Sequence, residues 1–129
     1  MKIKSLERKG KHWKIPIVGE SVTGVYIGDY FRLNFEESKW IDIEGDFKLL
    51  TRGQESLIQK ISLNDARKLI DLLHMKVTDS TACYSGELLL EFNNGMEIVV
   101  EDGPFENWHF YDNLRTAVHG GIGKLTEGE

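Results

Sequence analysis

The side chains that could bind a metal ion or act in catalysis are four histidines and a single cysteine. His12, His74, His109 and His119 are scattered along the chain, and none forms a recognised metal-ligand spacing with Cys83. No cationic residue adjoins Cys83 in the sequence to activate its thiol. We therefore expect no metal, no cofactor and an inert thiol. An enzyme would require His109 or His119 to meet a carboxylate in a cleft.

Two further motifs resemble binding loops but lack essential parts. The alternating acids at residues 42–46 resemble the start of a calcium loop, yet the glycine and the distal glutamate of that motif are missing. The glycine cluster at residues 120–123 follows no expected strand and opens no expected helix, so it does not predict a phosphate site. The sequence thus predicts no catalytic residue, and we expect a protein that is not an enzyme.

The elements that would position these side chains follow an internal repeat. Leu33-Asn34-Phe35 corresponds to Leu90-Glu91-Phe92, and the same offset of 57 residues relates Ile41 to Ile98. Within each copy, apolar side chains alternate with polar ones, as they do in a strand that buries one face. We interpret the chain as two copies of a three-strand antiparallel meander.

The apolar faces of the two meanders are the predicted core. Asn93-Asn94-Gly95 supplies residues that tolerate positive φ, which a tight hairpin between two strands requires. The predicted core residues are Phe31, Leu33, Phe35, Ile41, Ile43, Leu88, Leu90, Phe92, Met96, Ile98 and Val100.

One helix is expected between the copies, from about Ser62 to Leu73. Ser62 and Asp65 have the spacing of a capping box at its N-terminus. Its apolar residues recur at intervals of three and four, which predicts one buried stripe that covers the sheet. These residues are Leu63, Ala66, Leu69, Ile70 and Leu73.

Together these elements predict an α+β fold in which two pseudo-repeated antiparallel meanders, in the order βββ-α-βββ, form a sheet or a partly open barrel packed on one helix. We divide the chain into a basic N-terminal arm (1–14), a single α+β domain (15–112) and a C-terminal tail or last strand (113–129). Residues 51–60 show no clear period, and residues 105–110 fit either a strand or an aromatic plug.

The face of each meander opposite the predicted core carries side chains that are costly to leave in water. Either another element of the chain covers them, or they form a patch for a partner. Trp108 and His109 carry the same ambiguity, with burial in the core preferred for the indole. The candidate partner-binding residues are Tyr30, Arg32, Trp40, Asp42, Glu44, Leu89, Val99, Trp108 and His109.

Charge and cysteine content limit the classes of function. The formal net charge is −5, and the first fourteen residues carry +5, so residues from Ile15 onward carry −10. An acidic body repels phosphates, and we therefore expect no nucleic-acid partner. No apolar run approaches the roughly 20 residues of a membrane helix, so we expect no membrane partner. A single cysteine permits no internal disulfide and indicates a reducing cytoplasm.

Several motifs, taken in order, resemble an uncharacterised bacterial group, domain of unknown function family six-one-eight-eight. They are Ile15-Pro16-Ile17-Val18-Gly19, Val22-Thr23, Glu44-Gly45-Asp46-Phe47, Leu69 to Leu73, Leu90 to Gly95 and Phe105-Glu106-Asn107-Trp108. The resemblance supports the two-hairpin interpretation and implies no reaction. Small acidic domains of this kind are similar to immunity proteins, which neutralise a toxin by binding it.

Two functions of different classes follow from these observations. The first is a binding protein without catalytic activity, such as an immunity protein whose acidic surface, including the face that contains Trp40, meets the basic surface of a toxin-like protein. A second copy of the chain, paired through an open sheet edge, is a further possible partner. The alternative is a small-molecule-binding domain with a pocket between the sheet and the helix or the C-terminal aromatic residues.

Overall fold

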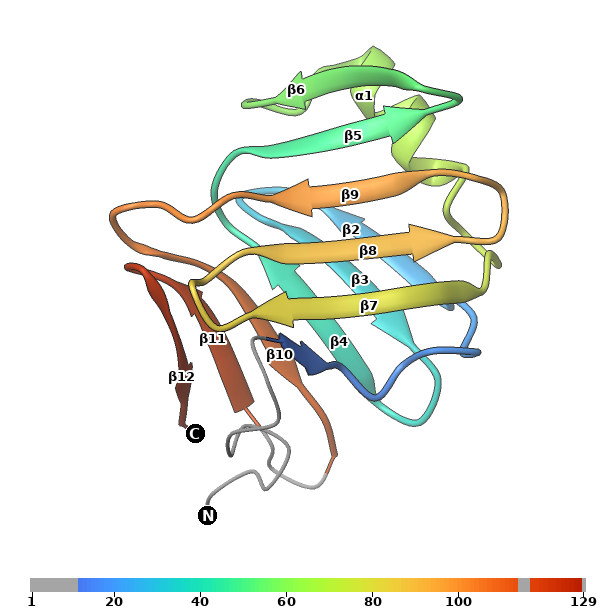
Figure 1. The fold of residues 1–129 in the computed structure, drawn as a ribbon. Helices are drawn as coiled ribbons and strands as arrows, with labels where there is room; N and C mark the ends of the chain where they lie inside the picture. The colour runs from blue at the N-terminus through green and yellow to red at the C-terminus, as the bar shows by residue number, and fades with distance from the viewer. Residues whose placement is uncertain (1–11, 114–116, 129) are drawn as a thin grey trace.

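The protein is a two-layer β-sandwich with one short helix at its edge. The computed structural model describes residues 12–113 and 117–128. Within these residues, two six-stranded antiparallel sheets pack face to face and share one hydrophobic core (Figure 1). Neither sheet closes into a barrel. The one helix in this part of the chain, α1, spans Leu63–Ile70.

Hydrogen-bonded pairing sets the order of the strands in each sheet. The first sheet contains, from edge to edge, β1 (His12–Lys14), β7 (Val77–Cys83), β8 (Leu88–Phe92), β9 (Glu97–Val100), β5 (Phe47–Thr51) and β6 (Gln54–Ile58). The second sheet contains, from edge to edge, β12 (Lys124–Glu127), β11 (Ala117–Gly121), β10 (Glu106–Tyr111), β4 (Lys39–Ile43), β3 (Phe31–Phe35) and β2 (Gly24–Ile27).

The two sheets exchange hairpins. Strands β2, β3 and β4 are consecutive neighbours in the second sheet, but the following hairpin, β5–β6, crosses to the first sheet and pairs with β9. In the same way β7, β8 and β9 are neighbours in the first sheet, and the following hairpin, β10–β11, crosses to the second sheet and pairs with β4. Each sheet is therefore assembled from distant parts of the chain.

The predicted core is confirmed, because all eleven of its side chains are buried. Leu33 in β3 and Leu90 in β8 are fully buried and occupy corresponding strands of the two sheets. The sequence duplication itself stays a prediction. The core also contains residues outside the predicted core set, among them Trp13, Ile15, Ile17, Val22, Phe47, Leu49, Ile58, Trp108, Phe110 and Val118.

The predicted α+β class is wrong, since the fold is mostly β and the helix is not the second layer. The extra hairpins complete two sheets whose apolar faces cover each other, so the helix is not needed to cover either apolar face. Helix α1 instead lies beside β2 at one edge of the sandwich (Figure 1). Leu69 is buried there, whereas Leu63 and Ile70 of the expected stripe are exposed.

The predicted start of the helix is confirmed. The Ser62 hydroxyl accepts a hydrogen bond from the backbone N–H of Asp65 at 3.1 Å. The Asp65 carboxylate accepts one from the backbone N–H of Ser62 at 3.0 Å. These two reciprocal bonds form a capping box, which satisfies backbone groups that a helix N-terminus leaves free.

Strands also occur in the segments that we assigned to the chain termini. Residues 12–14 of the basic arm form β1, and Trp13 is buried against Phe110. Residues 1–11 of that arm lie outside the described residues. In the C-terminal segment, β11 and β12 form the edge of the second sheet. The one described helix, of eight residues, is too short to cross a membrane.

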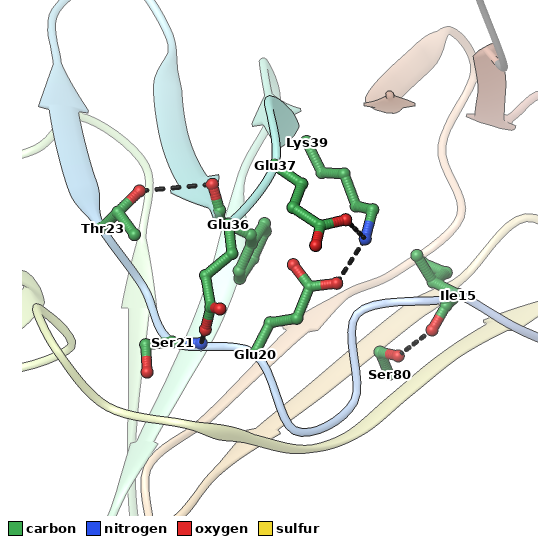
Figure 2. A network of polar contacts seen from close by, with 9 residues as sticks. Ile15, Glu20, Ser21, Thr23, Glu36, Glu37, Lys39 and Ser80 are labelled. Carbon is green, nitrogen blue, oxygen red and sulfur yellow. Dashed lines mark hydrogen bonds and ion pairs between the residues drawn. The ribbon is translucent and has the colours of Figure 1, made fainter. Parts of the chain in front are cut away.

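The connection between β1 and β2 closes one end of the sandwich through polar contacts (Figure 2). Lys39, at the start of β4, forms an ion pair with Glu20 of this connection, and that hydrogen bond raises the pKa of Lys39. The Ser21 backbone N–H donates to Glu36 at 2.7 Å, and the Ser80 hydroxyl donates to the carbonyl of Ile15 at 2.6 Å. The network holds the turn between β3 and β4 in place.

Candidate functional site

A continuous row of side chains crosses all six strands on the outer face of the second sheet. Cross-strand register places each member directly opposite the next, so distant parts of the sequence meet in one row. The row consists of Tyr26, Arg32, Asp42, His109, His119 and Thr126. We use the name aromatic face for the surface formed by Tyr26, Tyr30, Arg32, Trp40, Asp42, His109, Tyr111 and His119.

Arg32 lies at the centre of the aromatic face. Its Nε and Nη2 atoms donate to the two carboxylate oxygens of Asp42 at 2.6 and 2.9 Å. Its guanidinium carbon also lies 5.3 Å from the ring centre of Tyr30 and 5.2 Å from that of Trp40. The hydrogen bond to Asp42 raises the pKa of Arg32. A fork of this kind, flanked by two rings, holds the cation in one orientation.

Ring stacking extends the aromatic face on both sides of Arg32. The rings of Trp40 and Tyr111 stack with centres 5.3 Å apart, and those of Tyr26 and Tyr30 lie 5.0 Å apart. Burial raises the pKa of Tyr111. Trp40 and Tyr111 are only half-buried. The stacking therefore builds a rigid surface that remains open to a partner.

Two histidines meet on adjacent strands at the other end of the row. The Nδ1 atoms of His109 and His119 lie 2.6 Å apart, and Nε2 of His109 lies 2.6 Å from a carboxylate oxygen of Glu44. Burial, and then the neighbouring His109, lowers the pKa of His119. Glu106, His109 and His119 bring three potential metal-ligand atoms within 4.8 Å of one another. These two histidines are not scattered, contrary to our expectation.

A β-bulge brings Glu106 onto this face. Glu106 pairs with Gly121, whereas Trp108 pairs with the preceding residue, Gly120, so Asn107 is an extra residue in β10. Without the bulge, strand alternation would place Glu106 and His109 on opposite faces. Gly121 has a φ of +126° and would place a Cβ 2.2 Å from the carbonyl oxygen of Phe105, so only glycine fits opposite the bulge.

Trp108 is a core residue and not a surface contact. It is completely buried, and its indole N–H donates to the carbonyl of Gly86 at 2.8 Å. The ring packs so closely on Gly120 that a Cβ at that position would lie 2.1 Å from the indole. Burial of Trp108 was the preferred expectation, and it is confirmed. The glycine cluster thus serves strand packing in β11.

The remaining candidates lie on the outer face of the first sheet. Leu89 and Val99 are paired there and are half-buried between charged rows. We call this surface the acidic face, formed by Lys14, Lys48, Leu50, Glu55, Leu57, Asp79, Leu89, Glu91, Glu97 and Val99. The predicted partner-binding set therefore divides between two opposite surfaces and the core. Tyr30, Arg32, Trp40, Asp42 and His109 lie together on the aromatic face, with Glu44 at its border.

Sequence reasoning missed Tyr26, Glu106 and Tyr111, and it considered His119 only as a histidine that an enzyme would need beside a carboxylate. Tyr111 could have been found, since Trp108 and Phe110 alternate with it and with His109 along one strand. Glu106 and His119 gave no such signal, because one depends on a bulge and the other lies in a glycine-rich strand that resembles a turn.

Cys83 is half-buried, and burial raises the pKa of its thiol. The alternating acids are not simply a solvated face, since Asp42 is 8% exposed and bound to Arg32.

One cavity lies where the two crossing connections leave their sheets. It has a volume of about 660 Å³, and its wall includes residues 44–47, from the β4–β5 connection and the start of β5, and residues 101–107, from the β9–β10 connection and the start of β10. A smaller one of about 290 Å³ lies beside Tyr30 and shares Glu44 as a lining residue. Neither cavity is lined by residues of helix α1. Glu44 therefore connects the histidine pair with both cavities.

Comparison with known proteins gives a family but no activity. No curated protein and no solved structure matches the chain. One family model, described as "Family of unknown function (DUF6188)", matches residues 13–124. The match covers the whole aromatic face, as well as the cavity at the crossing connections. The chain therefore belongs to the family of unknown function DUF6188.

Proposed function

We propose that the protein is a binding protein without catalytic activity, and that it holds a protein partner on the aromatic face. The observation that carries the proposal is the array of Tyr30, Arg32, Trp40 and Tyr111, in which an arginine and three half-exposed rings are fixed against one another. Tryptophan, tyrosine and arginine dominate the energetics of protein interfaces.

The aromatic face is preorganised, which favours high affinity for a partner. β3, β4 and β10 are interior strands of the sheet, so backbone pairing on both sides fixes their positions. The bidentate contact with Asp42 already fixes the Arg32 rotamer, so binding would cost little further side-chain entropy. A preorganised surface of this kind needs fewer new contacts to reach a given affinity.

Charge indicates the kind of partner. The chain carries a formal net charge of −5, and Glu44 and Glu106 border the aromatic face with half-exposed or exposed side chains. Exposed rings beside carboxylates suit lysine and arginine side chains, which gain both cation–π contacts and ion pairs. A basic protein surface is therefore the partner we propose. By analogy with immunity proteins, that partner would be a toxin neutralised in the cytoplasm.

A paired substitution experiment tests this proposal. The double variant Trp40→Ala with Glu44→Ala removes a ring and a charge from the aromatic face. It should weaken binding of a partner captured from lysate by about 2 kcal/mol or more, roughly thirtyfold in Kd. Asp42 is unsuited to this test, because its loss would leave Arg32 without its carboxylate partner.

The matched control is Leu89→Ala with Val99→Ala on the acidic face, measured by calorimetry with the same partner. This control should bind as the unmodified chain does. Equal binding by the aromatic-face variant would contradict the proposal, and a loss only in the control would assign the interface to the other sheet. Thermal unfolding of each variant separates lost contacts from lost structure.

A small-molecule-binding domain is the second candidate, and the cavity beside Phe105 favours it. Its volume of about 660 Å³ lies within the range of small-molecule sites. Phe105 is 75% exposed at its wall, where it could close over a ligand. A metabolite that binds there must raise the melting temperature by mass action, and Phe105→Ala should abolish that rise. A screen of common metabolites without any shift would remove this candidate.

A further inference from the structure

We propose that Glu106, His109 and His119 form a binding site for one divalent transition-metal ion, with Zn²⁺ the best match. The three residues come from β10 and β11, and their ligand atoms lie within 4.8 Å of one another. Two imidazole nitrogens and one carboxylate oxygen are a ligand set that Zn²⁺ takes at sites where a fourth position stays open. Neither the ligand set nor the inference depends on the proposed protein partner.

The contact between His109 and Glu44 has the form of an outer-shell support for a metal ligand. His109 Nε2 lies 2.6 Å from the Glu44 carboxylate, on the opposite side of the ring from Nδ1. Ligating histidines commonly donate their second ring N–H to a carboxylate, which fixes the tautomer and the orientation of the ring. With its proton held at Nε2, His109 presents an Nδ1 lone pair toward His119.

The distance between the two histidines requires only a small adjustment, whereas ligand atoms of the triad that lie up to 4.8 Å apart must approach each other by roughly 1.5 Å. The two Nδ1 atoms are 2.6 Å apart, whereas two nitrogens bound to one tetrahedral Zn²⁺ lie about 3.3 Å apart, given Zn–N bonds of about 2.0–2.1 Å. Each ring must therefore retreat by only a few tenths of an ångström. His119 is half-buried and lies near the edge of the sheet, and Glu106 is also half-buried, so both side chains have room to move.

The donor set also selects the class of metal. Imidazole ligands favour zinc, copper, nickel and cobalt over magnesium and calcium, which prefer oxygen donors. Three protein ligands leave a fourth position, which water or a side chain of a bound protein would complete. The bulge at Asn107, which turns Glu106 to this face, therefore brings the only carboxylate of the triad to the histidine pair.

The contrasting account is a hydrogen bond between two neutral imidazoles with no metal. In that arrangement one Nδ1 carries a proton and donates it to the other. Metal binding needs both lone pairs, so His119 must then carry its proton on Nε2. The two accounts make opposite predictions for the binding of added metal, and this makes the site testable on the chain alone.

The experiment titrates the full chain with Zn²⁺ by calorimetry and with Co²⁺ by visible absorption. We expect one equivalent of either ion, and d–d bands of a four-coordinate Co²⁺ site. His109→Gln and His119→Gln should each weaken binding at least a hundredfold. Glu44→Gln, which removes the supporting carboxylate, should weaken it by ten- to a hundredfold. His12→Gln, an exposed histidine on β1, is the matched control and should bind as the unmodified chain does.

Loss of binding in a glutamine variant whose metal-free melting temperature is unchanged supports the site. If a histidine variant fails to fold, Glu106→Gln gives the same test, since this side chain lies at the end of β10 outside the hydrophobic core. A stoichiometry near zero, or binding that survives all three ligand substitutions, would overturn the proposal and leave the hydrogen-bonded pair.

Discussion

The two outer faces of the sandwich are each formed by six antiparallel strands, and they differ in chemistry. On each, a row of cross-strand neighbours runs over the strands of a six-stranded sheet. On the acidic face, Leu89 and Val99 lie near lysines and carboxylates. This is the usual composition of the solvated face of an antiparallel sheet. The aromatic face instead joins its residues through an arginine fork, stacked rings and a histidine pair. Equal exposure to solvent therefore does not explain the composition of the aromatic face.

The charges of cross-strand neighbours also differ between the two faces. On the acidic face, Glu91 lies near Glu97 and Asp79, and the pKa of Glu91 is raised first by burial and then by these two acids. Such like-charge neighbours oppose folding. On the aromatic face, the neighbours Arg32 and Asp42 carry opposite charges and support folding. The aromatic face is thus the more organised of the two, and the same kind of substitution should have unequal effects on the two sheets.

The largest effect is expected at Gly120, which supports the aromatic face from beneath. Gly120→Ala forces a methyl group into the Trp108 ring and should destabilise the protein by about 3 kcal/mol in a urea melt. Gly53→Ala, in the β5–β6 turn of the other sheet, is the control. Its φ is +79° and no atom lies within 4 Å of the added Cβ, so strain alone should cost about 1 kcal/mol. Equal losses would contradict the packing account.

Loss of a carboxylate should matter more on the aromatic face than on the acidic face. Asp42→Ala leaves the half-buried Arg32 without its partner and should cost about 2 kcal/mol. Asp79→Ala removes the partner of Lys14, whose side chain is 66% exposed, and should cost only about 0.5 kcal/mol. Chemical denaturation of both variants measures the difference. A larger loss at Asp79 would reverse the proposed ranking of the faces.

A double-mutant cycle should find coupling within the aromatic face and none between the faces. Trp40→Ala combined with Tyr111→Ala removes a stacked pair, for which we expect a coupling energy of about 1 kcal/mol. The cycle of Trp40→Ala with Leu89→Ala joins residues on opposite sheets and should be additive within about 0.4 kcal/mol. Additivity in the first cycle would mean that the stacked rings do not act together.

The smallest effect concerns pH and the acidic face. The hydrogen bond from Lys14 lowers the folded-state pKa of Asp79 below its usual value. The contribution of ionised Asp79 to the free energy of unfolding is therefore complete above the unfolded-state pKa of about 3.9. It is lost as the pH falls through the folded-state pKa. Unfolding free energies from pH 6 down to pH 2 should fall slightly less steeply for Asp79→Asn than for the unmodified chain. An identical pH dependence of the unfolding free energy in both proteins would show that the contact between Asp79 and Lys14 does not stabilise the fold.

The alternation of apolar and polar residues along single strands was sufficient to predict which side chains face the core. It identified the buried residues from Phe31 to Val100, and it placed Trp40 and Arg32 opposite the core. Capping chemistry identified the start of the helix at Ser62. These features depend on residues close in sequence, so local patterns determine them.

The layer architecture was not predictable in the same way. Leu49 and Leu50 put apolar side chains on both faces of β5, which hides its alternation, and the pairing of β5 with β9 joins residues far apart in sequence. The strand β11 resembled a turn because Gly120 must be small to admit Trp108. The histidine pair depends on the pairing of β10 with β11, which the turn-like sequence of β11 concealed. Glu106 joins the pair only because of the bulge in β10.

The central claim is that the aromatic face is the binding surface. Hydrogen–deuterium exchange of the chain, with and without its captured protein partner, tests this most directly. We predict slower exchange in β3, β4 and β10 on binding, with β8 and β9 unchanged. Protection of β8 and β9 alone, with exchange in β4 and β10 unaltered, would contradict the account.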